Sequence, residues 1–382
     1  MAVNSHFGIS FLKLKYNEMQ FSMRLLGICL GVLLHLVVLG QHSKAFFQTP
    51  TGKWVDTHAF DQHVQEAMKE AQVPGLSIAI INHKEVVYQG AFGVINAETQ
   101  TPVNYQTIFE AASLSKPIFA YFVMKMVEKG VIDLDEPLHS YLPYPYVKDN
   151  DERVQLITAR MVLSHSTGFP NWANGEMVEL KYSPGKGFSY SGEAYQYLAA
   201  LIGQEKGVGW KEELNQIFIE EVAKPLGLTN SSFAWNEDVA KHKAFGHKEG
   251  KPTDNGTGGW NGKTFGAGYS LHSNATDYAN FLVAMLQEKG LKPASFDLMK
   301  AEQNPIPEGH ELLAIGQTGW GLGFARRPTE NGMRYLHTGN NHDFQSFCSF
   351  NPENGFGIVF FINCEKGEDF LSHLGKFLDY KM

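Results

Sequence analysis

The chain has 382 residues, of which 43% are hydrophobic and 13% aromatic, and it carries a formal net charge of −8. That length supplies a large core and exceeds one simple domain. An acidic chain without a basic run is a poor nucleic-acid ligand, so we expect no nucleic-acid partner. The sequence has no H-E-x-x-H motif and no compact cluster of histidines and acids with metal-ligand spacing, so we predict no metal and no cofactor.

The first 45 residues have the features of a targeting segment. Residues 25–40 form a 16-residue run without a formal charge, which follows Arg24 and precedes Ser43-Lys44-Ala45. This arrangement predicts a secretory signal cleaved after Ala45, and hence a periplasmic or secreted protein, with Met1 or Met23 as the start. The run is shorter than the ~20 apolar residues of a spanning helix, but a membrane anchor at 25–40 is the alternative. Without residues 1–45 the net charge becomes −11.

Hydrophobic periodicity predicts strands near both ends of the remaining chain and helices between them. The first strands form a hairpin, and the region from Asp133 to about Asn255 is read as mostly helices and loops. The expected helices are 60–71, 118–131, 193–206, 277–289 and 370–380, and the expected strands are 76–81, 86–88, 321–325, 333–336, 344–350 and 356–363.

This order of elements predicts an α+β fold with one antiparallel sheet built from both termini. We expect the leader and signal peptide at 1–45, a sheet domain formed by 46–112 and 256–382, and a mainly helical region at 113–255. An active site is expected in the cleft between the sheet domain and the helical region.

Two cysteines, Cys348 and Cys364, remain after the predicted cleavage. They lie in apolar runs on either side of a turn at 351–355. Pairing across this turn would place Cys348 opposite about residue 358, so we expect buried free thiols and no disulfide.

A serine and a lysine spaced as S-x-x-K occur three times, at Ser10/Lys13, Ser113/Lys116 and Ser183/Lys186. The first pair lies in the leader, and the third spans a Pro-Gly turn, in which its side chains have no fixed relation. Only the second precedes an apolar helix, and Pro117 is tolerated only in a first helical turn, so the helix begins close to Ser113.

Residues three apart on a helix share a face, so the Lys116 amine is expected to reach the Ser113 hydroxyl. The free N–H groups and positive field of the helix N-terminus would disfavour a charged lysine and stabilise an oxyanion. The same residues also suit an ordinary helix cap, with Ser113 as N-cap and Lys116 in solvent. Spacing alone leaves both interpretations open.

Further stretches resemble the serine β-lactamase and penicillin-binding-protein family. They are VPGLSIAIINHKEVVYQGAFG (73–93), IFEAASLSKPIFAYFVMKMVEKGVIDLDEPLHSYLP (108–143), VLSHSTGFP (162–170), SPGKGFSYSGEAYQYLAALIG (183–203), KPLGLTNSSF (224–233), GAGYSLHSNATDYANF (266–281), GWGLGF (319–324) and HTG (337–339). Their order is most similar to that of class C β-lactamases and their relatives, the D-alanyl-D-alanine carboxypeptidases, D-aminopeptidases and β-lactamase-fold esterases. The resemblance covers about residues 55–365.

The resemblance implies roles for individual residues. Ser113 would be the nucleophile, Lys116 its base, and Tyr190 a partner base, either a phenolate or a tyrosine that shares a proton. The backbone N–H groups of Ser113 and Asn340 would form the oxyanion hole. The residues expected to bind substrate are His337, Thr338, Gly339 and Gly192.

Two of these positions depart from the family pattern. Gly192 replaces the asparagine of the Tyr-x-Asn motif, whose amide contacts the acyl-amide of β-lactams, and His337 replaces the lysine of Lys-Thr-Gly. His337 is familiar among D-peptidases, whereas Gly192 favours an esterase with a looser pocket. Both departures argue against an efficient β-lactamase.

The resulting hypothesis is a secreted serine hydrolase that forms an acyl-enzyme on an amide or ester carbonyl, as a D-peptidase or an esterase. The alternatives are a class C-type β-lactamase and a penicillin-binding or peptidoglycan-sensing protein without turnover. The expected partner is a small-molecule or peptide substrate, with possible peptidoglycan contact, and the sequence implies no obligate protein partner.

Overall fold

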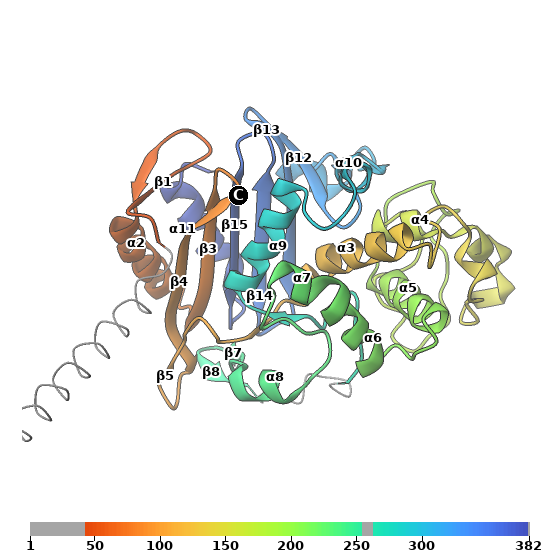
Figure 1. The fold of residues 1–382 in the computed structure, drawn as a ribbon, viewed down its shortest axis with the longest axis horizontal. Helices are drawn as coiled ribbons and strands as arrows, with labels where there is room; N and C mark the ends of the chain where they lie inside the picture. The colour runs from red at the N-terminus through yellow and green to blue at the C-terminus, as the bar shows by residue number, and fades with distance from the viewer. Residues whose placement is uncertain (1–42, 254–262, 381–382) are drawn as a thin grey trace, which may run out of the picture. The chain divides into compact units, whose positions relative to one another are not determined.

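A nine-stranded antiparallel sheet organises the chain (Figure 1). In the computed structural model, which describes residues 43–253 and 263–380, both ends of the chain contribute strands to this sheet, as the sequence predicted. In spatial order the strands are β10 (Asn304–Pro305), β11 (Gly319–Trp320), β12 (Ala325–Thr329), β13 (Gly332–Asn340), β14 (Gln345–Asn351), β15 (Phe356–Ile362), β3 (Gly75–Asn82), β4 (Glu85–Asn96) and β5 (Thr101–Pro102).

Helices lie on both faces of the sheet and extend away from it on one side (Figure 1). Three short strand pairs complete the fold: β1 (Phe46–Gln48) with β2 (Trp54–Asp56), β6 (Phe109–Glu110) with β9 (His272–Ser273), and β7 (His247–Lys248) with β8 (Lys251–Pro252). The helices are α2 (Thr57–Glu70), α3 (Ser115–Glu128), α4 (Ala159–Leu163), α5 (Gly192–Glu205), α6 (Glu212–Phe218), α7 (Lys224–Leu226), α8 (Glu237–His242), α9 (Ala275–Gln287), α10 (Pro293–Lys300) and α11 (Gly367–Phe377).

The central strands are apolar on both faces because each face carries its own core. In β3, Leu76, Ile78 and Ile80 pack with residues of α2 and α11, whereas Ala79 and Ile81 join the core that contains α3, α5 and α9. Side chains alternate along a strand, so a strand covered on both sides reads as one continuous hydrophobic run. This is the physical reason why 76–81 and 356–363 were recognisable from sequence.

One expected strand is wrong. Residues 321–325 were predicted as a strand, but the chain turns between β11 and β12, and only Ala325 is part of a strand. Gly323 has φ +89°, and a Cβ at this position would lie 2.6 Å from the Cβ of Ala120 in α3. The glycines of 319–324 therefore serve a tight turn against α3, where strand pairing is impossible.

The predicted register around the cysteines is confirmed within one residue. Cys348 in β14 lies opposite Val359 in β15, and Cys348 and Cys364 are both buried free thiols. Burial raises the pKa of each thiol to about 12, which keeps both protonated and unreactive at neutral pH.

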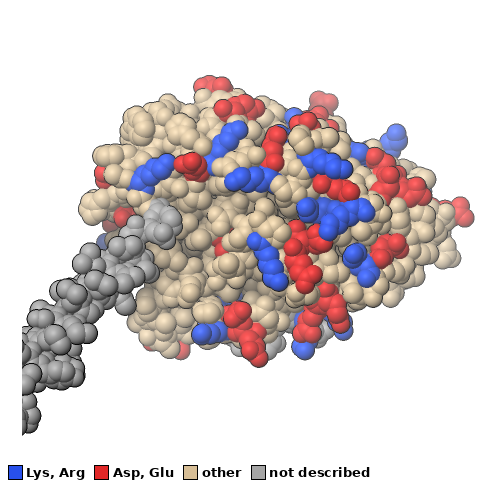
Figure 2. Space-filling view, viewed as in Figure 1, with Lys and Arg blue, Asp and Glu red and all other residues tan. Residues whose placement is uncertain are grey.

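The predicted signal run, 25–40, lies outside the described residues, so the localisation stays a prediction. Within 43–253 and 263–380, no helix has the length and apolarity needed to cross a membrane. On the face shown in Figure 2, lysines and arginines are interspersed with acids and form no separate basic surface.

Candidate active site

Ser113 lies in a tight turn immediately before α3. A single 3-10 turn, Ala112–Leu114, links β6 to the helix, and Ser113 is partly exposed there. Ala112 has φ +50°, a conformation that costs a non-glycine residue of order 1–3 kcal/mol and is common near active sites. The residue at the N-cap of α3 is Leu114, with no side-chain cap. Ser113 is therefore not the helix cap that spacing alone allowed.

The neighbouring serine, Ser115, has the structural role. Its hydroxyl donates to Ala112 O at 2.6 Å and accepts from the N–H of Leu271 at 2.9 Å. These two bonds tie the turn to the segment that precedes β9. Ser113 is thus left with its hydroxyl directed toward Lys116.

Lys116 is wholly buried within the first turn of α3. Its Nζ donates to Ser113 Oγ at 3.2 Å and to Gly268 O at 2.8 Å, and lies 4.5 Å from the ring centroid of Tyr190. Burial lowers the pKa of Lys116 to about 7. A large fraction of the molecules therefore carries a neutral amine at neutral pH, which is the form that can accept a proton.

Tyr190 approaches the same hydroxyl from the segment before α5. Burial raises the pKa of Tyr190 well above its usual value, while a hydrogen bond with Ser113 acts in the opposite direction. The net rise means that the side chain is a neutral phenol near pH 7. Of the two roles considered for Tyr190, the structure therefore favours a shared proton over a phenolate.

Two buried histidines flank the Tyr190 ring. The His165 ring packs against it in a tilted arrangement, with a centroid distance of 4.3 Å and an interplanar angle of 34°, and His337 lies at a centroid distance of 6.0 Å. Burial, together with the nearby Lys116, lowers the pKa of His337 to about 3 and that of His165 well below its usual value. Both rings are neutral at pH 7, so His337 has no positive charge with which to attract a substrate carboxylate.

Hydrogen bonding fixes the protons on these rings differently. His337 Nδ1 lies 2.8 Å from the carbonyl oxygen of Thr338 and must donate to it, which leaves Nε2 as an acceptor. His165 Nδ1 accepts from the N–H of Ser191 at 3.1 Å, which leaves its Nε2 as a donor. His165 was not among the predicted site residues, although it lies within the VLSHSTGFP stretch.

The H-T-G motif forms the last part of β13. Thr338 and Asn340 are exposed, whereas Gly339 is buried against the turn that holds Ser113. A Cβ on Gly339 would lie 2.4 Å from the carbonyl oxygen of Ala111 and 3.2 Å from the Cβ of Ala112. Glycine at this position therefore lets the strand approach the turn closely, with Asn340 following on the strand.

The position of Gly192 is closed, whereas the sequence had suggested an open pocket there. Gly192 begins α5, and a Cβ there would lie 2.3 Å from Cη2 of Trp172. The indole ring fills the space that a side chain would need, which corrects the expectation of a looser pocket. Trp172 was missed because it lies twenty residues away in a loop of no regular pattern, and its one signal was a large aromatic residue between polar and small ones.

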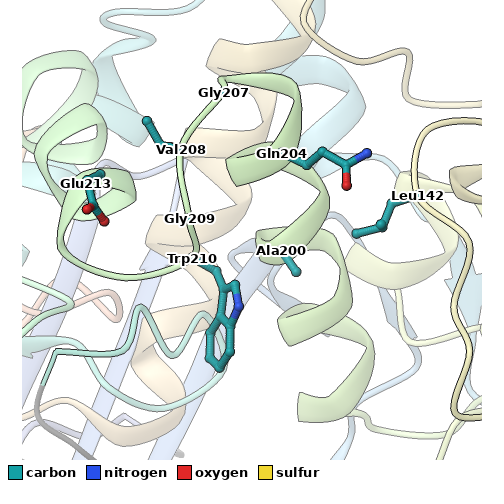
Figure 3. Close-up of a pocket in the computed structure, with 8 residues that line it drawn as sticks. All are labelled: Leu142, Ala200, Gln204, Gly207, Val208, Gly209, Trp210 and Glu213. Atoms are coloured by element: carbon teal, nitrogen blue, oxygen red, sulfur yellow. The ribbon is translucent and has the colours of Figure 1, made fainter.

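A separate cavity lies at the opposite end of α5 (Figure 3). It has a volume of about 710 Å³, and Ala200, Gln204, Trp210 and Glu213 contribute to its lining. Gln204 is roughly 18 Å along the helix from Gly192, given a rise of 1.5 Å per residue. None of the candidate catalytic residues contributes to its lining, so this cavity and the candidate site are distinct.

The beta-lactamase family profile matches residues 60–376. The chain belongs to the beta-lactamase family. The arrangement of Ser113 and Lys116 accords with a family of serine hydrolases. Among the described residues, no group of three or more histidines, cysteines or acids is placed to hold a metal ion.

Two relatives show how distant the similarity to individual proteins is. The chain is 22% identical over 325 residues to Protein flp of Staphylococcus aureus, and this match covers 79% of the chain but 62% of that protein. It is 26% identical over 204 residues to Esterase EstB of Burkholderia gladioli, covering 45% of the chain and 50% of the esterase. The chain thus spans less than two thirds of these relatives.

Solved structures of other proteins share the fold. The octameric penicillin-binding protein homologue from Pyrococcus abyssi has a TM-score of 0.69 at 21% identity, over 85% of this chain and 78% of its own. The D-alanine carboxypeptidase AmpC from Burkholderia cenocepacia has a TM-score of 0.68 at 19% identity, over 84% of this chain and all of its own. These likenesses confirm the predicted α+β fold.

Proposed function

We propose that the chain is a hydrolase that forms an acyl-enzyme at Ser113 and that acts on esters in preference to D-peptides or β-lactams. The observation that carries the proposal is the buried Lys116 amine, which contacts the hydroxyl of Ser113. A neutral amine in that position is a general base, and a partly exposed serine is a nucleophile that a substrate can reach.

The reaction follows from these contacts. Lys116 Nζ takes the Ser113 proton while Oγ bonds to the substrate carbonyl carbon, and the N–H groups of Ser113 and Asn340 hold the oxyanion. The proton then passes through Tyr190 to the leaving oxygen or nitrogen as its bond to carbon breaks. Water attacks the acyl-enzyme, gives a proton to the same base, and releases the acid, and the proton returns to Ser113.

The preference for esters rests on two positions. A neutral His337 offers no charge for the carboxylate of a peptide or a β-lactam, and Gly192 offers no amide for an acylamido group. The similarity to an esterase supports the same reading. A D-peptidase is the second candidate because the H-T-G motif resembles that of D-peptidases.

Covalent labelling tests the nucleophile, and a substrate panel tests the class. A fluorophosphonate or a fluorescent penicillin should label Ser113, as located by mass spectrometry, and Ser113→Ala should remove the label. Turnover of p-nitrophenyl acetate, a D-Ala-D-Ala peptide and nitrocefin should be fastest for the ester. Absence of any label in folded protein would contradict the proposal, and a burst without steady turnover would favour a penicillin-binding or peptidoglycan-sensing role.

We also propose that the enzyme works outside the cytoplasm, because residues 1–45 have the pattern of a secretory leader. Expression of the full chain in a bacterium, followed by fractionation and N-terminal sequencing, should give a periplasmic or secreted product that begins at Phe46. A full-length product in the membrane fraction would instead favour the anchor at 25–40.

A further inference from the structure

The space beside Gly192 belongs to the candidate site and is filled by an aromatic ring. A Cβ on Gly192 would lie 2.3 Å from Cη2 and 2.4 Å from Cζ2 of Trp172. No side chain larger than hydrogen fits there while the ring keeps its place. The position at which related enzymes present an amide is therefore covered by an apolar surface.

Hydrogen bonds on both sides fix Trp172 in this position. On one side, Asn171 accepts from the N–H of Gly192 through both its backbone oxygen and its Oδ1, each at 3.0 Å. On the other side, the N–H of Ala173 donates to Glu193 Oε2 at 3.2 Å. The loop is thus bound to the first turn of α5 directly before and directly after the tryptophan.

The indole ring also lies near the Lys116 amine. A Cβ on Gly268 would lie 3.4 Å from Trp172 Cη2 and 3.3 Å from Lys116 Nζ, so the two atoms border the same methyl-sized space. Tyr269 meets the indole edge-to-face at a centroid distance of 5.6 Å. Trp172 remains 36% exposed, so part of the indole is available to a substrate bound at Ser113.

We propose that Trp172 is a specificity-determining residue that selects esters with an apolar acyl group and rejects acylamido substrates. An alkyl or aryl acyl group buries apolar surface against the indole. An acylamido group at the same place would lose water and gain no hydrogen-bond partner, which a binding site penalises strongly. This inference rests on the proposed function, because it assumes that the acyl group is attached to Ser113.

The test compares p-nitrophenyl phenylacetate with p-nitrophenyl acetate in the full-length protein. We expect the wild type to favour the phenylacetate ester, and Trp172→Ala to lower the ratio of the two kcat/KM values about tenfold or more, mainly through KM for the larger ester. Trp172→Phe should keep most of the preference. Trp210→Ala, which removes an exposed tryptophan of the separate cavity, is the matched control and should leave the ratio unchanged.

A second pair of variants probes the filled space directly. Gly192→Asn alone should lose activity, because its side chain collides with the indole, whereas Gly192→Asn combined with Trp172→Ala should accept a benzoyl-D-Ala-D-Ala peptide or nitrocefin more readily than either single variant. Fluorophosphonate labelling of Ser113 is run on every variant. An unchanged ester ratio in Trp172→Ala with labelling intact would overturn this inference alone, whereas loss of labelling in the wild type would overturn the proposed function.

Discussion

The side chain of Lys116 is held more closely by Gly268 than by Ser113. Nζ lies 2.8 Å from the carbonyl oxygen of Gly268 and 3.2 Å from Ser113 Oγ. The stronger bond goes to a backbone acceptor that cannot take a proton, so it orients the amine without consuming its basicity. Of these two contacts of Lys116 Nζ, only the Ser113 hydroxyl has a proton that the amine can accept.

The two serines of the turn give a matched test of this arrangement. Ser113→Ala should lower kcat/KM by roughly 10³-fold or more, with little change in thermal stability, because Ser113 is partly exposed and caps no helix. Ser115→Ala should keep the covalent label but lower the free energy of unfolding by about 1–3 kcal/mol, because the Leu271 N–H and the Ala112 carbonyl lose their partner. Ester assays and urea unfolding of both variants measure these effects, and the reverse pattern would contradict the assignment.

The pH dependence of catalysis follows from the pKa of about 7 at Lys116. Because the neutral amine is the proposed base, kcat/KM for an ester should rise with pH through about 7 and level off above it. Lys116→Arg keeps a cation but lacks a titratable base, so the pH profile of its residual kcat/KM should show no rise near pH 7. A rate that falls as pH rises through 7 would mean that the protonated lysine is required.

The same shift in pKa predicts a cost in stability. The folded pKa of Lys116 lies below the unfolded value of ~10.4, so the unfolded state binds more protons between these limits and stability rises with pH across them. Lys116→Met removes the buried amine and should raise the free energy of unfolding at pH 7 by about 1–4 kcal/mol. The gain should shrink toward pH 10, which urea unfolding at both pH values would reveal.

The contact between Ser113 and Lys116 was predictable from the sequence because it is local. Ser113 and Lys116 lie one turn apart, and Pro117 marks the start of a helix, so short-range rules predict that the two side chains meet. Their proposed roles came from the family resemblance, because spacing alone left the helix-cap interpretation open. The central strands were equally visible, because two-sided burial produces unbroken hydrophobic runs.

The features behind the proposed specificity were not predictable in this way. Trp172 meets Gly192 only because hydrogen bonds join a loop to the first turn of α5, and no periodicity records that contact. The neutrality of His337 depends on burial and on a nearby lysine distant in sequence, which spacing does not reveal. The strand predicted at 321–325 is wrong because the glycines of this segment form a turn against α3. Packing against the helix requires that turn, and the segment's own sequence does not reveal it.

The neutral histidines predict that the fold weakens in mild acid. The pKa of His337 is about 3 and that of the buried His272 about 4, mainly because of burial, and both lie below the unfolded value of ~6.5. The unfolded state therefore binds more protons below pH ~6.5, so stability is lost as pH falls toward these values. Each histidine contributes a slope of up to about 1.4 kcal/mol per pH unit.

A single substitution isolates one of these contributions. His337→Gln should flatten the dependence of the free energy of unfolding on pH between 4 and 6, while the rise of kcat/KM near pH 7 keeps its position, because that limb belongs to Lys116. Urea unfolding at several pH values measures the first effect, and an ester assay measures the second. A limb that moves with His337→Gln would show that the histidine, and not the lysine, titrates during catalysis.

A substitution at Gly339 tests how closely β13 must approach the turn that carries Ser113. In Gly339→Ala the new methyl group would lie 2.2 Å from Ser346 Oγ and 2.4 Å from the carbonyl oxygen of Ala111. The backbone carbonyl of Ala111 cannot rotate aside as a flexible side chain does. The strand must therefore move away from the turn, which widens the proposed oxyanion hole. We expect kcat to fall by roughly 10²-fold, the loss typical of one missing oxyanion donor.

Gly209→Ala is the control, because its Cβ meets nothing within 4 Å, and it should change neither kcat nor thermal stability appreciably. Steady-state kinetics and thermal unfolding of the two variants decide the matter, since an active Gly339→Ala enzyme would show that the approach of β13 is not needed for catalysis.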